Sequence, residues 1–550
     1  MIFHLYNRRH VSYSRISASL YKTSMKNLQS VSILAIGISA AMSQAVAATQ
    51  TKGKRPNILI CMADDAAHMG AYGNRWVNTP NFDRVAREGL LFRNAFTCNS
   101  KSAPSRASFI TGRNSWQLCE AANHWCEFPR DIMSFPEALQ LNGYFTGYTG
   151  KGWGPGIATD SLGNDRLLTG RPYNDITCTP PTKQINAIDY SANFAQFLKE
   201  WDGEQPICFW YGAREPHRKY EYGSGIRAGK SLTDIDSVPS YWPDNETVRT
   251  DMLDYAYEIE YFDRHLGNIL AQLDSIGQLD NTIVIVTSDN GMPFPRCKGQ
   301  EYYQASHLPM AMMWHDGLKH PGREVNEIIS QIDIAPTLME LAGVDPVNSG
   351  MLPVTGRSMT DIIADKTNPK VDRGYVMLGK ERHDVGRPDD QGYPIRGIVR
   401  DGYLLLRNYA TDRWPSGNPS TGYMDTDGSP TKTEIIKARL DSASHYLWNL
   451  SMGKRPELEL YDIKSDAECI NNLADNPDMA EIITRLNREM TERLIDEGDP
   501  RMFGKGHLFD QYPSMNKSHM YWNRVNAGEK KVPHSWISKT DFDPAAEESE

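Results

Sequence analysis

The chain has 550 residues, 40% of them hydrophobic and 23% charged, a composition typical of a globular protein that forms one large domain and a smaller one. Its formal net charge of -10 argues against nucleic acid or an anionic membrane as a partner, because both select for a basic face. Binding of an anionic substrate would therefore require a local cluster of cations.

The N-terminus has the pattern of an export signal. Lys26 supplies positive charge, residues 31–42 form an apolar run, and Ala45-Val46-Ala47 offers small residues for cleavage. We expect residues 1–47 to be a signal peptide, in which Met25 offers a later start. The apolar run is shorter than the roughly 20 residues that cross a bilayer, so no membrane span is expected. Export predicts a periplasmic or secreted protein.

The eight cysteines would enter an oxidising compartment after export, which is consistent with one or two disulfides. Cys119 and Cys126 are the pair closest in sequence, although the sequence alone does not assign the pairing. The spacing of cysteines and histidines does not indicate a zinc site.

Two apolar runs end in acidic residues. Residues 55–65 (RPNILICMADD) and residues 282–291 (TIVIVTSDNG) each predict a buried strand that carries carboxylates at its carboxyl end. Strands of this kind are typical of α/β folds, in which the site lies beyond the carboxyl ends of the strands.

Helix and strand patterns alternate between these two runs. Residues 79–92 and 135–151 each predict a helix followed by a strand, and residues 206–217 predict another buried strand. Pro80 and Gly89 bracket the first of these helices in the expected order. We therefore predict an α/β fold with a large, mixed and mostly parallel sheet between layers of helices.

The pattern changes to shorter strands after Gly343. Residues 395–409 and 457–466 predict antiparallel strands, and residues 479–495 predict a helix that covers them. We expect a catalytic domain over residues 54–385, an antiparallel sheet and helix subdomain over 386–510, and a C-terminal tail over 511–550.

Polar residues at the two acidic strand ends form a candidate metal site. Asp64 and Asp65 end the first strand, and Asp289 and Asn290 end the second. Carboxylate and amide oxygens are hard ligands that suit calcium or magnesium, whereas zinc would recruit histidine or cysteine. A single Asp pair could instead cap a helix, but two such pairs on matching strands favour the metal site.

Residues 102–113, with the sequence SAPSRASFITGR, carry the most specific motif of the chain. The motif resembles the sulfatase signature, in which Cys or Ser precedes x-Pro-Ser-Arg and Thr-Gly-Arg follows a few residues later. A Ser/Pro turn leading into a helix would explain the first half of the motif but leaves Arg106 and the Thr-Gly-Arg unexplained. The resemblance extends from Arg55 to about Pro500 and implies an alkaline-phosphatase-like fold.

The resemblance implies that a sulfatase-maturating enzyme oxidises Ser102 to formylglycine, as in the bacterial members whose motif begins with serine. A serine hydroxyl is a weak nucleophile, whereas one oxygen of the hydrated aldehyde, held against a divalent cation, is readily deprotonated and attacks sulfur. The second hydroxyl then releases sulfate as the aldehyde re-forms. By the same resemblance, the cation is calcium in preference to magnesium.

Further positions match the family one by one. Lys151 would contact sulfate and the aldehyde, Lys298 would be a second cation on sulfate, and Arg106 would fix the region of the diol. His217 would be the general acid for the leaving group. A solvated surface lysine and a structural histidine are the alternative interpretations of Lys151 and His217.

One position departs from the family pattern. Many sulfatases carry a histidine two residues after the lysine that corresponds to Lys151, and Trp153 stands there in this chain. That histidine is the usual base for sulfate release, so the base is not assigned here. His68, His124 and His307 are available, and their spacing selects none of them.

Within the family, the chain most resembles the heparan N-sulfatase (sulfamidase) group. The segments SDNGMPFP and EPHR, and RHDV followed by YPIR over residues 382–396, carry this likeness. His383 and Arg387 fall where substrate contacts would be expected, although a charged loop is usually only solvated.

The leading hypothesis is hydrolysis of a sulfate ester or an N-sulfate on a glycan such as a glycosaminoglycan. A phosphodiesterase or phosphatase of the same superfamily is the alternative enzyme, but such enzymes typically use two zinc ions and a histidine where Asn290 stands. A glycan-binding protein that never acquires the aldehyde is the alternative from another class.

Overall fold

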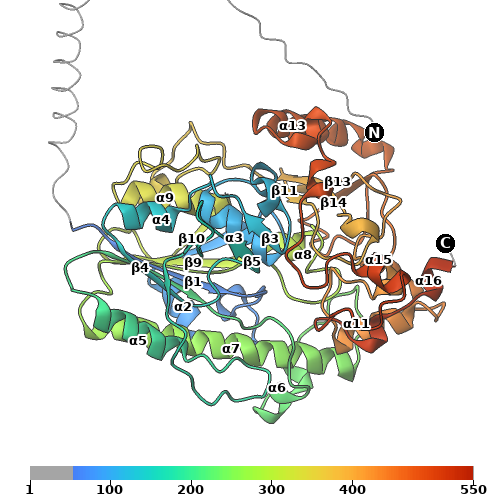
Figure 1. Ribbon diagram of the computed structural model, residues 1–550, viewed down its shortest axis with the longest axis horizontal. Helices are drawn as coiled ribbons and strands as arrows, with labels where there is room; N and C mark the ends of the chain where they lie inside the picture. The colour runs from blue at the N-terminus through green and yellow to red at the C-terminus, as the bar shows by residue number, and fades with distance from the viewer. Residues whose placement is uncertain (1–53, 549–550) are drawn as a thin grey trace, which may run out of the picture. The chain divides into compact units, whose positions relative to one another are not determined.

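An eight-stranded sheet forms the centre of the computed structural model, which describes residues 54–548 (Figure 1). The predicted signal peptide, residues 1–47, lies outside the described residues. The strands follow the order β10 (Arg323–Ser330), β2 (Leu90–Phe96), β9 (His307–Met313), β8 (Thr282–Ser288), β1 (Asn57–Ala63), β7 (Ile207–Gly212), β4 (Phe145–Gly150) and β6 (Arg171–Pro172).

Most neighbouring strands of this sheet run parallel. β1 pairs in parallel with β7 on one side and with β8 on the other. β9 runs antiparallel to both β8 and β2. This arrangement confirms the predicted α/β fold with a mixed, mostly parallel sheet, and it places the carboxyl ends of β1 and β8 side by side.

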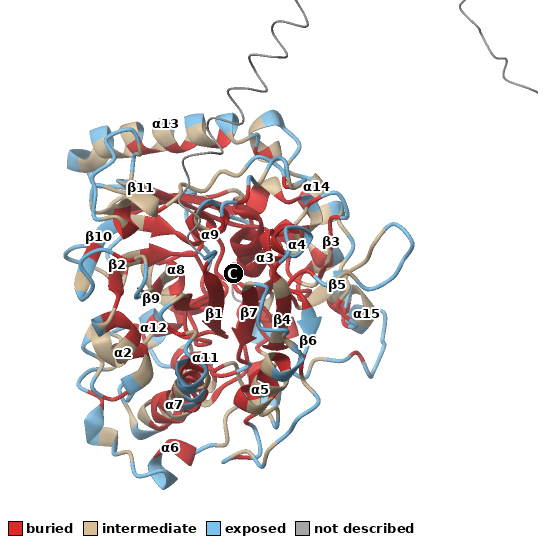
Figure 2. Cartoon of the chain, turned by 90° about the vertical axis from the view of Figure 1, so that its left-hand side faces the viewer, coloured by how far each residue is buried: buried red, intermediate tan, exposed pale blue. Residues whose placement is uncertain are grey.

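Helices cover both faces of the sheet (Figures 1 and 2). Alternate residues of β1 explain why: Leu59, Cys61 and Ala63 join the apolar core on one face, and Ile58 and Ile60 join the core on the other. One face is covered by α2 (Pro80–Arg87), α5 (Tyr190–Glu200) and α7 (Glu246–Ser275), and the other by α3 (Ser102–Thr111), α4 (Phe135–Leu141) and α9 (Ile334–Leu341).

A second, four-stranded sheet is fully antiparallel, as the sequence predicted. It consists of β11 (Tyr375–Lys380), β12 (Ile395–Arg400), β13 (Tyr403–Asn408) and β14 (Leu458–Asp462). The sequence interpretation had not included β11. Helix α13 (Ala480–Asp496) packs Leu486, Met490 and Leu494 against this sheet.

The C-terminal segment contains only short helices in its described part, among them α14 (Leu508–Gln511) and α15 (Tyr521–Asn526). It packs back onto helix α11 (Pro430–Ala438) and the residues that follow it. Asp541 pairs with Lys432 at 3.3 Å, and Asp543 pairs with Arg439 at 2.8 Å. The tail is therefore part of the folded unit.

All eight cysteines lie within the described residues, and none of them forms a disulfide. The disulfides that export suggested are therefore not present in this structure. Among the described helices, none is both long and apolar enough to cross a membrane.

Candidate active site

The carboxyl ends of β1 and β8 bring the two predicted polar pairs together. Carboxylate oxygens of Asp64, Asp65 and Asp289 lie within 4.8 Å of one another. The side-chain amide of Asn290 donates to Asp65 Oδ1 at 2.7 Å. Asp65 takes the left-handed conformation with φ of 75°, which Asp tolerates better than most residues. The strand end thus presents two consecutive carboxylates to one site.

Arg106 lies within this acidic group and is fully buried. Its Nε donates to Asp289 Oδ2 at 2.8 Å, and its Nη2 donates to Asp64 Oδ1 at 3.4 Å. Its Nη1 donates to the backbone carbonyls of Lys151 and Gly152. A planar guanidinium can make these contacts in several directions at once, so Arg106 connects the ends of β1, β8 and β4.

Ser102 begins helix α3 beside the same carboxylates. Its hydroxyl donates to Asp64 Oδ1 at 3.0 Å, and Lys151 Nζ lies 2.8 Å from the same oxygen. The serine therefore lies at the N-terminal end of a ten-residue helix, where the helix dipole and free backbone N–H groups favour negative charge.

Lys298 and His217 complete the group around Asp65. Lys298 Nζ lies 2.7 Å from Asp65 Oδ2 and 2.8 Å from Asp427 Oδ2. His217 Nε2 lies 3.9 Å from Asp65 Oδ2. Its Nδ1 lies 2.7 Å from the carbonyl oxygen of Arg218, and because a carbonyl only accepts, Nδ1 carries a hydrogen. Nε2 is left to interact with a substrate.

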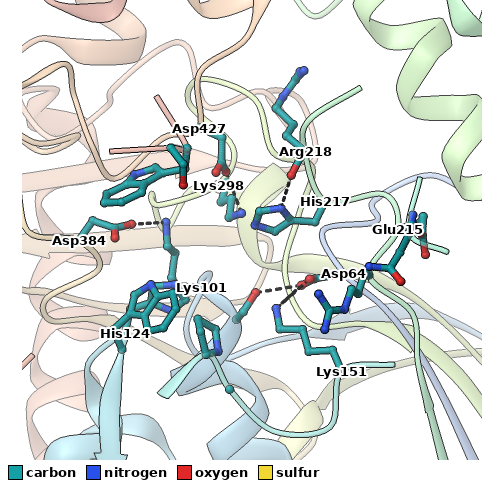
Figure 3. A pocket seen from close by; sticks show the side chains of 18 of the residues that line it. Asp64, Lys101, His124, Lys151, Glu215, His217, Arg218, Lys298, Asp384 and Asp427 are labelled. Carbon is teal, nitrogen blue, oxygen red and sulfur yellow. Dashed lines mark hydrogen bonds and ion pairs between the residues drawn. The ribbon is translucent and has the colours of Figure 1, made fainter. Parts of the chain in front are cut away.

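A cavity of about 580 Å³ opens over these residues (Figure 3). Its lining includes five of the predicted site residues: Asp64, Ser102, Lys151, His217 and Lys298. The other predicted metal ligands and Arg106 lie behind them and are buried. The volume is within the usual range for ligand pockets, roughly 300–1,000 Å³.

Burial and crowding shift the pKa values of this group. Burial raises the pKa of Asp289 to about 6, and the charge of Asp64 adds to this effect. Burial also acts to raise the pKa of Asp64, but Lys151 and Arg106 outweigh it and hold that pKa well below its usual range. The pKa of Lys151 is lowered by burial, and Asp64 opposes that shift. A divalent cation would relieve the carboxylate repulsion that raises the pKa of Asp289.

The donor set fits a hard cation. Asn290 Oδ1 is buried and has no hydrogen-bond partner among the described residues, which is costly unless a ligand satisfies it. The oxygens of Asp64, Asp65 and Asp289, which lie within 4.8 Å of one another, are donors of the kind that calcium and magnesium prefer. Neither histidine nor cysteine belongs to this set, whereas the neighbouring group of Asp65, His217 and Asp427 includes a histidine.

His383 and Arg387, which were predicted as substrate contacts, lie apart from the residues that line the cavity. Both are buried. His383 Nε2 lies 2.8 Å from Asn99 Oδ1, and Arg387 pairs with Asp425 at 2.7 Å. Both residues belong to buried polar networks, and their role as substrate contacts stays a prediction.

The structure adds cavity residues that the sequence interpretation did not assign. Lys101 precedes Ser102 and pairs with Asp384 at 2.8 Å, and Asp427 reaches the cavity from a distant loop. Of the three unassigned histidines, His124 lines this cavity, where its Nδ1 accepts from the Ala103 N–H at 3.4 Å. Lys101 could have been suspected from its place beside the motif, but Asp427 carries no such signal.

The fold and the site together define an α/β protein with a buried serine beside a group of carboxylates that could hold a cation. The sulfatase family model matches residues 56–344, more than half of the chain. The protein belongs to the sulfatase family, and the phosphatase alternative is not favoured.

Two curated relatives and one solved structure illustrate the likeness. N-sulphoglucosamine sulphohydrolase of Homo sapiens is 26% identical over 81% of this chain and 91% of its own length. An ulvan-active sulfatase of Formosa agariphila is 24% identical over 83% of this chain and 78% of its own. A protein solved in complex with its substrate D-glucosamine-2-N,6-O-disulfate shares the fold, with a TM-score of 0.56, 20% identity, and coverage of 81% and 99%.

Glu301 gives a pH-dependent prediction, because it holds the loop before Ser102. Its carboxylate accepts from the Ser100 N–H at 3.2 Å and from the Ser100 hydroxyl at 3.0 Å, and burial raises its pKa to about 8. The folded state therefore binds this proton more tightly than the unfolded state, so the stability from this group falls as pH rises from about 4.5 to about 8. Glu301→Gln should raise Tm at pH 8 and change it little at pH 5.

The effect at pH 8 should be on the order of a few kcal/mol, measured by thermal unfolding across that pH range. Glu204→Gln changes an exposed glutamate and is the matched control. Parallel Tm profiles for the wild type and Glu301→Gln would contradict the prediction.

Proposed function

We propose that this sulfatase removes sulfate from a glucosamine-containing glycan, as an O-sulfate ester or an N-sulfate. One observation supports the chemistry above all: the Ser102 hydroxyl is 3.0 Å from Asp64 at the start of α3. Lys151 and Lys298 line the same cavity, so a sulfate group there would meet both a nucleophile and cations. The substrate class follows from the named activity of the human relative, N-sulphoglucosamine sulphohydrolase.

We propose that Ser102 becomes formylglycine through a sulfatase-maturating enzyme. The hydrated aldehyde supplies an oxygen nucleophile for sulfur and a second hydroxyl that allows sulfate to leave. The signal-like segment at residues 1–47 supports export to the periplasm or the medium, where a polymeric glycan is accessible.

Asp64, Asp65, Asp289 and Asn290 would hold a calcium ion. A bound calcium ion supplies positive charge that lowers the pKa of an oxygen nucleophile and stabilises charge on sulfate. The unpartnered Asn290 Oδ1 and the crowded carboxylates support this assignment. Magnesium is the less suitable ion, because it demands a smaller and more regular octahedral cage.

The cations of the site would bind the sulfate and fix the nucleophile. Lys151 lies beside Ser102 through their shared partner Asp64, so its ammonium group would contact both the diol and a sulfate oxygen. Lys298 approaches from the side of Asp65 and Asp427 and would contact sulfate there. Arg106 would hold the carboxylates in place from below.

Two histidines have suitable positions for proton transfer. His217 presents Nε2 to the cavity because Nδ1–H is held by the Arg218 carbonyl, so a proton on Nε2 would pass to the leaving group. His124 is our candidate for the base that acts at sulfate release. Burial, together with Lys101 and Lys151, holds the pKa of His124 well below its usual range, so the ring is neutral. Its Nδ1 accepts from the Ala103 N–H at 3.4 Å and would give up that hydrogen bond to take a proton.

Replacement of Ser102 tests the nucleophile. Ser102→Ala should abolish turnover of 4-nitrophenyl sulfate and of O- and N-sulfated glucosamine, with Tm within about 2 °C of the wild type, because it removes little more than one hydroxyl. Mass spectrometry of the native protein should show the loss of two hydrogens at Ser102. Ser108→Ala, on the same helix, is the matched control.

Turnover of 4-nitrophenyl phosphate faster than of 4-nitrophenyl sulfate would contradict the sulfatase assignment. Unmodified Ser102 in every preparation, together with saccharide binding, would favour a glycan-binding protein.

Calcium binding is measurable without turnover. Free calcium at 100 times its Kd should stabilise the fold by about 2.7 kcal/mol, seen as a rise in Tm. Asn290→Ala should weaken calcium binding at least tenfold in calorimetry, since it removes an oxygen donor that has no other described partner. Asn348→Ala, in an exposed loop, is the control. Tight zinc binding without calcium binding would exclude the proposed ion.

The general-acid role predicts a dependence on the leaving group. His217→Ala should lower kcat/KM for a sulfated saccharide by about 10²–10⁴ and for 4-nitrophenyl sulfate by much less, because a good leaving group needs little protonation. His320→Ala, with a side chain that is 78% exposed, should change neither. Equal losses on both substrates would show that His217 has another role.

A further inference from the structure

Three tryptophans contribute to the wall of the cavity that contains Ser102. They are Trp125, Trp153 and Trp536, and each is only partly buried. A sulfate group gains from cations and N–H donors, and the indole N–H of Trp153 and of Trp536 already donates to the backbone. We therefore expect these side chains to contact the part of the substrate that carries the sulfate.

The polar atoms of two of these indoles are already engaged. Trp153 Nε1 donates to the Ala103 carbonyl at 3.3 Å, and Trp536 Nε1 donates to the Met424 carbonyl at 3.0 Å. Trp153 also packs edge to face on Phe128 at a ring separation of 5.1 Å. With the N–H groups occupied, these rings offer a substrate their apolar surfaces.

Trp536 is fixed in place although it belongs to the C-terminal tail. Its carbonyl accepts from the Gly428 N–H at 2.8 Å, so the tail is joined to the loop that carries Asp427. Ile537 packs with Val385 and Met424 in a small apolar cluster. The ion pair of Asp541 with Lys432 anchors the chain a few residues later. A fixed ring loses little entropy when a ligand stacks on it.

Carboxylates share this part of the cavity with the aromatic rings. Asp384 and Asp427 both line it, and carboxylate oxygens accept hydrogen bonds from hydroxyl groups. Apolar ring faces next to hydrogen-bond acceptors match a pyranose, which has C–H groups on its faces and hydroxyls at its edge. The volume of about 580 Å³ leaves room for such a ring beyond the sulfate.

We propose that Trp536 is a specificity-determining residue that stacks on the pyranose ring bearing the sulfate. The C-terminal tail would thus supply part of the substrate site. This inference rests on the proposed glycan sulfatase function and adds to it the residue that recognises the sugar.

Binding to a protein that cannot turn over tests the proposal. In the Ser102→Ala background, calorimetry would give the Kd of N-sulfo-D-glucosamine and of inorganic sulfate. Trp536→Ala should raise the Kd of the saccharide about tenfold and that of inorganic sulfate by a much smaller factor. Trp536→Phe keeps an aromatic face and should recover most of the saccharide affinity. Trp522→Ala, in α15 of the same tail, is the matched control.

Steady-state kinetics of the matured enzyme distinguish a role in binding from a role in folding, because the two roles change KM and kcat differently. Trp536→Ala should raise KM for the saccharide about tenfold while changing kcat less than threefold, whereas loss of folded protein would lower the apparent kcat. Thermal unfolding of each variant shows whether the tail still packs.

The outcomes separate this proposal from the function on which it rests. A saccharide Kd for Trp536→Ala within twofold of its parent, or equal losses for saccharide and inorganic sulfate, would overturn the stacking role and leave the sulfatase function intact. The absence of any saccharide binding by the Ser102→Ala protein would overturn both.

Discussion

The site depends on the neutralisation of carboxylates that β1 and β8 force together. Two unit charges 4.8 Å apart repel by about 3–4 kcal/mol at an effective dielectric constant of about 20. Arg106 counters Asp64 and Asp289, and Lys298 counters Asp65. Removal of either cation would leave buried charge unpaired. The same balance of positive and negative side chains would let a divalent cation and an anionic sulfate bind side by side at the ends of β1 and β8.

Much of the fold followed from local patterns in the sequence. β1 and β8 were predictable because strands buried on both faces are continuously apolar, and their acidic ends indicated which edge holds the site. α13 followed from its periodicity. β11 was missed because a single short strand, Tyr375–Lys380, has no periodic neighbour that would identify it. Its pairing with β12 is a long-range interaction.

The site residues also divide into those that a local motif identifies and those that only long-range contacts bring together. Ser102 and Arg106 belong to one continuous motif, so their proximity was encoded locally. Asp427 approaches Lys298 from more than a hundred residues away, and no short-range pattern reports such a contact. His383 and Arg387, predicted as substrate contacts, lie in a stretch that a charged sequence would leave solvated, but both are buried, and Arg387 pairs with Asp425 in the interior. Burial of an ion pair depends on a partner that spacing does not reveal.

The structure separates the chemistry of the site from the selection of its substrate. Groups that would act on sulfur lie at the rigid sheet edge, where each side chain has several partners and small displacements are costly. The groups that would contact the rest of the substrate include Asp384, Asp427 and Trp536, which come from loops and the C-terminal tail. Loops tolerate change better than the sheet that supports them. One sheet edge could therefore serve many sulfated sugars, and the sugar preference of this chain would depend on the cavity wall outside that edge, to which Trp125, Trp153 and Trp536 contribute.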